Sequence, residues 1–556
     1  MKTRPLVEAA LIRNLRHIRT IGCFPIYVEL LQLLAHGLPE KKDDFFEDPG
    51  TLCTNLRRID LDSFCSKDFY FYAQQVDRLL RHNHRLTHLV VCFEILLYEN
   101  AYSTISTLRH LQHFTVNCLE DYAQTDQICG LLRACLPLPE LTELDFVETD
   151  ILWDDLDSDT TEGTALLGTV LREATIARFA HNPAAKRIKS MRFPGTVGWA
   201  WVPLPLLLLK SDLLDLETCY VPSFSEDMDV DELELVVREH CPNLKHLSCR
   251  FLRTPAEVEV VRAFIRGCSG LQSFTSSNFH DEIGHEERQL LLELVTRHHT
   301  TLEVFEVDVT DQRFSRNLQK VLSQCKQLKR FGVISDRKTT RSAIVAMDIY
   351  GSDWVCLELR ELGLVLNLRP NDKAFFADMD LKKVEEWVAV DDETEEQVIT
   401  IRSKYGEVVE WDKDESDSYR PLVALATKRV YNQIGRLEKL EELTLGIDRS
   451  DKTWQLPSDY EFNLTLCKGW LGEMAGMKNL RRLRLEADFW SAMGQAEVEF
   501  MHKHWPLLRE ITFPCDIAQI HAMSHWQWLL SQRPHLCYLS THPAVAVKPG
   551  WEDDPS

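Results

Sequence analysis

The 556-residue sequence predicts an α/β solenoid, in which a short strand and a helix alternate along one continuous repeat array. Three observations support this prediction. The chain is too long for a single hydrophobic core, an apolar pattern recurs along it at nearly regular spacing, and helix signals stand between the copies. The pattern is Leu-x-x-Leu-x-Leu, with Ile, Phe, Val or Met as substitutes. It is typical of leucine-rich repeats, so we expect a horseshoe with a parallel concave sheet and outer α-helices.

The copies of this pattern cover most of the chain. Clear copies are led by Leu56, Leu86, Leu111, Leu141, Ile188, Leu302, Leu328, Leu359, Leu440, Leu480 and Leu508. Weaker copies begin at Leu213, Leu244, Leu271 and Leu536, and we expect a first copy at Leu15. Most neighbouring copies are 25 to 31 residues apart. This length is at the upper end for such repeats, so each connector has room for a full helix.

The connectors carry helix start and stop signals. Thr254 and Glu257 form a capping-box pattern around Pro255, and apolar residues follow at helical spacing as far as Gly267. Asp311 opens a second connector, with Phe314, Leu318, Val321, Leu322 and Cys325 on one face. Proline stands two residues before the leading residue in four repeats, where it ends a helix: Pro139, Pro242, Pro506 and Pro534.

The cysteines also follow the repeat. Cys53, Cys241, Cys268 and Cys325 each stand three residues before a leading leucine. No two of the 16 cysteines form a Cys-x-x-Cys pair. A recurring position predicts a recurring buried niche, which a free cysteine fills as a small hydrophobe. We therefore expect neither disulfides nor a metal site.

Interruptions of the period define the expected organisation. We predict a tail over 1–10, repeats over 11–369, an acidic insertion over 370–418, repeats over 419–542 and a tail over 543–556. Residues 378–417 hold 15 acidic and 5 basic residues. Within them 398–401 and 408–411 are expected to pair as a hairpin, and 421–437 to form the helix that resumes the array. The insertion is either a solvated loop or a docking arm, since insertions in repeat arrays often lie on the binding face.

Charge and hydropathy narrow the choice of partners and compartment. The 63 Lys and Arg against 86 Asp and Glu give a net charge of −23, which disfavours nucleic acid and anionic membranes. The N-terminus lacks the apolar core of a signal peptide, and the longest apolar run, 197–209, is too short to cross a bilayer. We expect an intracellular protein, cytoplasmic or nuclear.

No catalytic or nucleotide-binding motif accompanies the repeats. The sequence contains no phosphate-binding loop, dinucleotide fingerprint, nucleophile elbow or His-Glu-x-x-His pair. Its 20 histidines include no zinc-finger spacing. We therefore expect a non-enzymatic protein without a cofactor, and we expect no catalytic, cofactor-binding or metal-binding residues.

The remaining surface is the predicted concave face. Residues that flank the second and third apolar positions of each repeat should point out of the sheet. These candidate protein-binding residues are Arg58, Asp60, Asp62, His113, Asn117, Glu143, Asp145, Arg192, Asp215, Glu217, His246, Arg250, Glu306, Asp308, Arg330, Glu361, Glu442, Arg482, Arg484 and Glu486, followed by Glu510 and Tyr538. The alternation of charge suits a protein partner, possibly a basic one.

The repeat sequences also indicate a family. The runs Cys-Pro-Asn-Leu-Lys-His-Leu from Cys241 and Cys-Thr-Asn-Leu-Arg-Arg-Ile from Cys53 resemble the cysteine-containing repeats of F-box proteins. In style the chain, from about Leu11 to His542, is similar to fungal F-box/leucine-rich-repeat proteins with a ribonuclease-inhibitor-like horseshoe. The resemblance implies the substrate-recognition part of a ubiquitin-ligase receptor. Because the first repeat begins near Leu15, we expect Skp adaptor and cullin as partners only through an F-box outside this chain.

Two other functions stay open at this point. An acidic horseshoe could cover the active site of a basic enzyme, as a regulator or inhibitor of the ribonuclease-inhibitor type. A pocket on the repeat face could instead bind a small molecule or peptide, which would make the chain a sensor.

Overall fold

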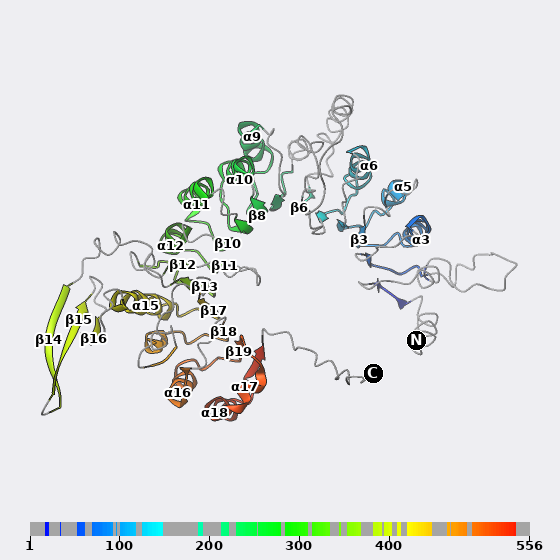
Figure 1. Cartoon of the computed structure of the whole chain (residues 1–556). Coiled ribbons are helices and arrows are strands. Elements are labelled where there is room, and N and C mark those ends of the chain that lie inside the picture. Colours follow the sequence, from blue (N-terminus) through cyan, green and yellow to red (C-terminus); the bar gives the residue numbers. More distant parts are fainter. Residues whose placement is uncertain are drawn as a thin grey trace, which may run out of the picture. The chain divides into compact units, whose positions relative to one another are not determined.

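The structure of the chain is a computed structural model. It describes residues 17–21, 34, 53–61, 69–92, 96, 101–117, 125–147, 187–192, 213–221, 229–252, 254–279, 284–309, 314–333, 344–345, 353–367, 382–391, 394–402, 408–412, 420–447, 464–466, 469–485 and 492–540. The chain, coloured along its sequence in Figure 1, divides into two compact units, unit 1 (Met1–Leu271) and unit 2 (Gln272–Ser556).

The described strands of unit 1 form a parallel sheet in which each strand pairs with the next one along the chain. They are β1 (Thr20–Ile21), β2 (Arg58–Leu61), β3 (His88–Cys92), β4 (His113–Asn117), β5 (Glu143–Val147), β6 (Ser190–Arg192), β7 (Thr218–Val221) and β8 (His246–Leu252). Equivalent repeat positions lie side by side, because Ile59 pairs with Leu89 and Leu89 with Phe114. The repeat pattern therefore sets the register of the sheet.

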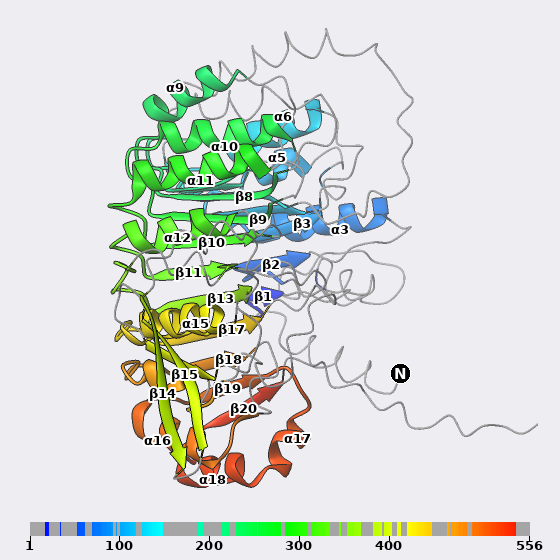
Figure 2. The same cartoon turned by 60° about the vertical axis from the view of Figure 1, so that its left-hand side comes forward.

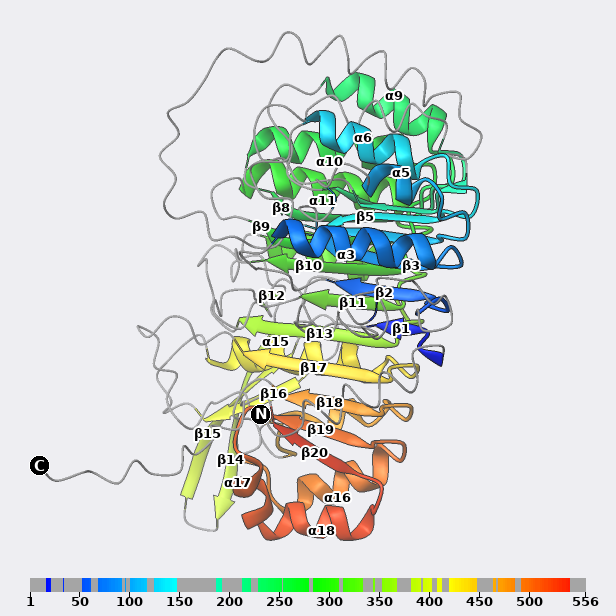
Figure 3. The same ribbon diagram turned by 90° about the vertical axis from the view of Figure 1, so that its right-hand side faces the viewer.

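The described repeat strands of unit 2 are also parallel (Figure 3). Their order is β9 (Ser273–Phe279), β10 (Val304–Val309), β11 (Arg330–Val333), β13 (Glu361–Asn367), β17 (Glu442–Ile447), β18 (Arg482–Leu485), β19 (Glu510–Phe513) and β20 (Cys537–Ser540). A short strand, β12 (Ile344–Val345), pairs with the end of β13. Parallel strands joined by helical connectors confirm the predicted α/β leucine-rich-repeat solenoid.

Helices in the connectors cover one side of each sheet (Figure 1, Figure 2). Unit 1 contains α3 (Phe69–His82), α5 (Ala101–Ile105), α6 (Thr125–Cys135), α9 (Val230–His240) and α10 (Pro255–Gly267). Unit 2 contains α11 (Gly284–His298), α12 (Ser315–Gln324), α15 (Arg420–Gly435), the 3-10 turn η7 (Leu471–Met474), α16 (Gln495–His504), α17 (Ile517–Ala522) and α18 (Ser524–Gln532). Apolar strand and helix residues meet in the core between these layers.

The start of α10 confirms the predicted capping box. The Glu257 amide donates to Thr254 Oγ1 at 3.3 Å, and the Thr254 amide donates to Glu257 Oε2 at 3.0 Å. These two bonds satisfy amide groups that the first turn leaves without helical partners. In α12 the predicted apolar face is buried, although the helix begins at Ser315 after Phe314. Asp311, which we expected to open this connector, lies outside the described residues.

Two weak repeats have a register different from the predicted one. In the seventh strand Cys219 and Val221 pair with Leu247 and Cys249, so the leading residue of this repeat is Leu216. Leu213 instead fills the buried position that Cys241 occupies in the next repeat. Likewise Ile21 pairs with Ile59, which makes Ile18 the leading residue of the first repeat rather than Leu15. Both errors are shifts of three residues.

The cysteine niche, the position three residues before each leading residue, is buried as predicted. Of the eleven cysteines whose side chains are described, ten are buried and Cys537 is exposed. Burial raises the pKa of Cys53 to about 11 and the pKa values of Cys241 and Cys325 to about 12. These thiols therefore stay protonated at neutral pH.

Asn83 fills the same niche in another repeat. Its side-chain amide donates to the Cys53 and Leu79 carbonyl oxygens at 2.8 Å, and its side-chain oxygen accepts from the Leu56 amide at 2.8 Å. Asn83 is 1 % exposed, so these bonds compensate for its burial and tie two repeats together.

We expect the exposed Cys537 to be alkylated long before the niche cysteines in the native protein. The thiolate is the reactive form, and burial both raises the thiol pKa and blocks access. The measurement is iodoacetamide labelling at pH 8 followed by peptide mass spectrometry, with the protein in urea as the control that labels every cysteine. Labelling of Cys241 or Cys325 at the rate of Cys537 would contradict a buried niche.

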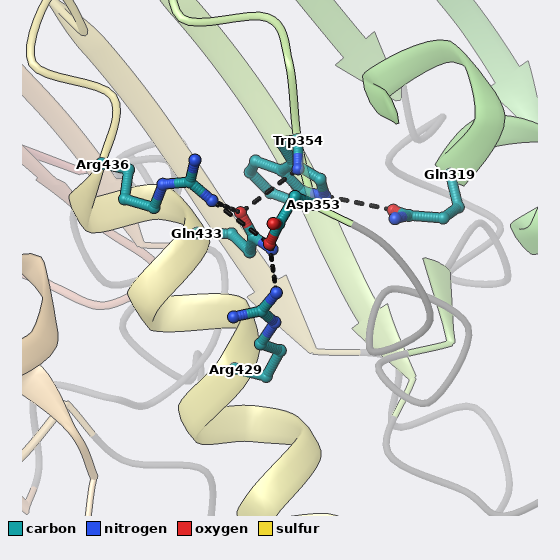
Figure 4. A network of polar contacts seen from close by, with 6 residues as sticks. All are labelled: Gln319, Asp353, Trp354, Arg429, Gln433 and Arg436. Carbon is teal, nitrogen blue, oxygen red and sulfur yellow. Dashed lines mark hydrogen bonds and ion pairs between the residues drawn. The ribbon is translucent and has the colours of Figure 1, made fainter. Parts of the chain in front are cut away.

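A buried tryptophan joins two helices of unit 2 (Figure 4). Trp354 is 1 % exposed. Its indole N–H donates to Gln319 Oε1 on α12 at 3.1 Å, and its amide donates to Gln433 Oε1 on α15 at 3.3 Å. Trp354 therefore positions α12 and α15 relative to one another.

The neighbouring Asp353 carboxylate anchors α15 from the side (Figure 4). It accepts hydrogen bonds from Gln433 Nε2 at 3.1 Å and Arg436 Nη1 at 3.3 Å, and it pairs with Arg429. Burial acts to raise the Asp353 pKa, but these partners outweigh it, so the pKa is lowered. Stability from Asp353 is therefore present at neutral pH and is lost as the pH falls through the lowered pKa.

The acidic insertion contains an antiparallel sheet that lies against α15 (Figure 1). Its strands are β14 (Lys382–Asp391), β15 (Thr394–Arg402) and β16 (Val408–Asp412). The pairing of Ile399 with Trp411 and Ile401 with Val409 confirms the predicted hairpin, while β14 was not predicted. The helix expected over 421–437 is α15. The domain boundaries at 10, 369, 418 and 542 stay predictions.

Candidate protein-binding surface

The sheet of unit 1 has an open face, defined as the side opposite its helices. Its strands place two rows of side chains on this face, one residue of each row per strand. The first row is Arg58, His88, His113, Glu143, Ser190, Thr218 and His246, and the second is Asp60, Val90, Thr115, Asp145, Arg192, Tyr220 and Ser248. Each of them is half-buried or exposed, whereas their strand neighbours are buried.

Two stacked imidazole rings lie near the middle of the first row. The ring centroids of His88 and His113 are 4.1 Å apart, and the ring planes differ by 15°. His113 Nδ1 lies 2.5 Å from Glu143 Oε2 on the next strand. Burial and the positive charges of His113 and Arg58 lower the His88 pKa, although Glu143 opposes them. The neutral form of His88 is therefore favoured near pH 7.

The second row carries a carboxylate, a guanidinium and an aromatic ring on consecutive strands. The Arg192 guanidinium carbon lies 4.4 Å from the centroid of the Tyr220 ring, within the range of a cation–π contact. Burial raises the pKa of the Asp145 carboxyl, while the positive charge of Arg192 opposes this change. We call His88, His113, Glu143, Asp145, Arg192 and Tyr220 the central cluster.

The open face of unit 2 differs because its charges pair across the strands. Arg330 lies 3.4 Å from Glu306 and 2.5 Å from Glu361 on its two sides, and hydrogen bonding to Glu361 raises the Arg330 pKa. Arg482 pairs with Glu442. At the edge of the same face Lys329 pairs with Glu303 at 2.7 Å, and Glu441 lies between Arg360 and Arg481. These ladders neutralise much of the surface charge within the protein itself.

Most predicted surface residues lie on open faces. The residues with described side chains there are Arg58, Asp60, His113, Glu143, Asp145, Arg192, His246, Glu306, Arg330, Glu361, Glu442, Arg482, Arg484 and Glu510. Arg250 and Asp308 belong to β8 and β10, and Asp62 and Glu486 lie outside the described residues. The binding role of this whole set stays a prediction.

Four predicted surface residues are not part of the open faces. Asn117 is only 5 % exposed. Asp215 and Glu217 precede β7, because the leading residue of that repeat is Leu216 rather than Leu213. Tyr538 pairs with the buried Ile511, and its hydroxyl donates to the Trp526 carbonyl oxygen at 2.9 Å, so it faces the core.

The sequence analysis did not predict two members of the central cluster, His88 and Tyr220. His88 precedes the second apolar position of its repeat, so the rule applied to the other repeats would have selected it. The same rule selects Tyr220 only when Cys219 is taken as the second apolar position of its repeat, which shifts the register of that repeat by three residues.

Other kinds of site find no support in the described part of the chain. No three His, Cys, Asp or Glu side chains group there as metal ligands would. Within the same residues, no helix is long and apolar enough to cross a membrane.

No family model matches the sequence, and no curated protein matches it. A chain in the crystal structure of the yeast Rad7 and Elc1 complex is 11 % identical with a TM-score of 0.34, over 97 % of this chain and 87 % of that chain. A likeness this weak carries no argument about function.

Proposed function

We propose that this leucine-rich-repeat protein is a non-enzymatic scaffold that binds another protein on the open face of unit 1. The observation that carries the proposal is the central cluster. Five neighbouring strands, β3 to β7, present its imidazole, carboxylate, guanidinium and phenol groups side by side on the face opposite the helices. Solenoids use such extended sheet faces for binding.

The chemistry of the cluster favours a protein partner. Tyrosine and arginine are enriched among the residues that dominate binding energy at protein interfaces. Each row holds both positive and negative groups, and such a mixed surface can match the mixed charges of a protein better than the uniform charge of a polyanion. The net charge of −23 also disfavours nucleic acid.

A finer proposal concerns the biological role. The cysteine-containing repeats from Cys53 and Cys241 resemble those of F-box/leucine-rich-repeat receptors, so we propose that the bound partner is a ubiquitin-ligase substrate. Under this proposal, Skp adaptor and cullin join through an F-box outside this chain, in the cytoplasm or the nucleus.

We expect the double substitution Arg192→Ala and Tyr220→Ala to release the partners of the chain. Truncation of interface hot-spot residues costs about 2 kcal/mol or more, which is roughly a thirtyfold loss of affinity. The measurement is affinity purification of tagged full-length protein from cells that express it, with quantitative mass spectrometry. Cullin and adaptor peptides among the captured proteins would support the ligase role.

The matched control is Arg238→Ala on α9, whose side chain is 55 % exposed on the helix side of unit 1. The control protein should keep the partners that the double variant loses. If both variants retain the same partners at the same level, the open face of unit 1 is not the binding surface.

A further inference from the structure

The open face of unit 1 contains a carboxylate, Asp145, that is in no ion pair with the described residues. In unit 2, Glu306, Glu361 and Glu442 each lie beside an arginine from an adjacent strand. In unit 1, Glu143 contacts His113. Asp145 forms no ion pair with the described residues, although its register partner on β6 is Arg192.

The Asp145 carboxylate is partly desolvated and is not in contact with the nearest guanidinium. Arg192 is placed over the Tyr220 ring at 4.4 Å, so its guanidinium is directed to the aromatic face. Asp145 is half-buried between β4 and β6, and loss of hydration is the largest effect on its carboxyl, whose pKa is raised. A partly desolvated carboxylate gains most from a cation that replaces the lost water.

We infer that the open face of unit 1 receives a lysine or arginine side chain of its protein partner at Asp145, with Glu143 on the same strand as a second acceptor. The inference rests on the proposed function and names the chemistry of the contact. The register neighbours of Asp145 are Thr115 on β4 and Arg192 on β6, and the His113 ring beside Glu143 offers a flat surface to the aliphatic stem of the basic residue.

The observations favour a basic group over an acidic or phosphorylated one. A phosphate needs free arginine or lysine donors, whereas Arg192 is engaged with Tyr220 and Arg58 lies 3.8 Å from Asp60. His88 and His113 could attract an anion only when protonated, and Glu143 already contacts His113. The excess of acidic residues in the whole chain adds a long-range attraction for basic partners.

The test uses a display library of random dodecapeptides selected against the full-length protein. We expect selected peptides to share a lysine or arginine, and their affinity, measured by fluorescence anisotropy, to fall at least tenfold when that residue becomes glutamine. Asp145→Asn, which keeps the size of the side chain, should cause a similar loss. In the double-mutant cycle the two changes should be far from additive, with a coupling of about tenfold.

The matched control is Glu259→Gln on α10, whose side chain is 36 % exposed on the helix side of unit 1 and which should leave peptide affinity within twofold of the original protein. Selected peptides without a shared basic residue, no binding peptide at all, or equal affinity for Asp145→Asn and the original protein would each overturn the inference. If peptide affinity falls for Arg192→Ala and Tyr220→Ala but not for Asp145→Asn, only the proposed contact of a basic side chain with Asp145 is wrong. If peptide affinity is unchanged by all three substitutions, the proposal that the open face of unit 1 binds a protein is wrong as well.

Discussion

Gly435→Ala should lower the free energy of unfolding of unit 2 by about 3 kcal/mol or more. Gly435 ends α15 where this helix meets η7, and a Cβ atom there would overlap the backbone of Glu473 and lie 3.2 Å from the Met474 Cα. Overpacking in a closely packed region costs about 1 to 3 kcal/mol, and more when backbone rather than a side chain must move. A Cβ atom at Gly476 would likewise overlap the Gly435 carbonyl oxygen.

The matched control is Gly472→Ala, because a Cβ atom at Gly472 in η7 meets nothing within 4 Å. Urea unfolding followed by circular dichroism would measure both variants. We expect the control to stay within about 0.5 kcal/mol of the original protein. Equal midpoints for the two variants would show that α15 and η7 do not approach each other closely.

Trp354→Ala should destabilise unit 2 by about 3 to 5 kcal/mol, the usual cost of removing a fully buried tryptophan. The indole fills the space between α12 and α15, and its loss also removes the bond to Gln319. Hydrogen exchange measured by mass spectrometry should show faster exchange in both helices, since each loses the contact that positions it.

Trp354→Phe separates packing from hydrogen bonding. It keeps most of the buried volume and removes the donor to Gln319 Oε1, so we expect a loss of about 1 to 3 kcal/mol. If Trp354→Phe were as harmful as Trp354→Ala, the polar contact rather than the buried volume would dominate. If neither variant changed the hydrogen-exchange rates of α12 and α15, the conclusion that Trp354 positions both helices would be wrong.

The repeat period was sufficient to predict most of the fold, because one apolar pattern specifies strand, register and inward face together. It failed in the repeat of β7, where two buried positions three residues apart are both leucine. Leu213 and Leu216 are each buried, so the pattern begins equally well at either, and only the pairing of Cys219 with Leu247 decides between them. The third insertion strand, β14, was missed because its charged sequence lacks a clear apolar alternation.

The candidate surface was less predictable than the fold. The apolar alternation along a strand predicts which side chains point out of the open face, but it does not predict which side chains of other strands they contact. The contact between Arg192 and Tyr220 joins residues 28 positions apart through the pairing of β6 with β7. Burial of Asn117 likewise depends on surroundings that a single strand pattern does not contain.

The direct pairing of β13 with β17 has a consequence for how this protein can change over evolution. Glu361 to Leu366 match Glu442 to Ile447 residue by residue, although the acidic insertion lies between them in the sequence. The sheet therefore continues past the insertion, and the hydrogen bonds between these strands do not depend on its length. A change in the length of the insertion therefore leaves this strand pairing intact, so over evolution its length is less constrained than the repeat period on either side of it.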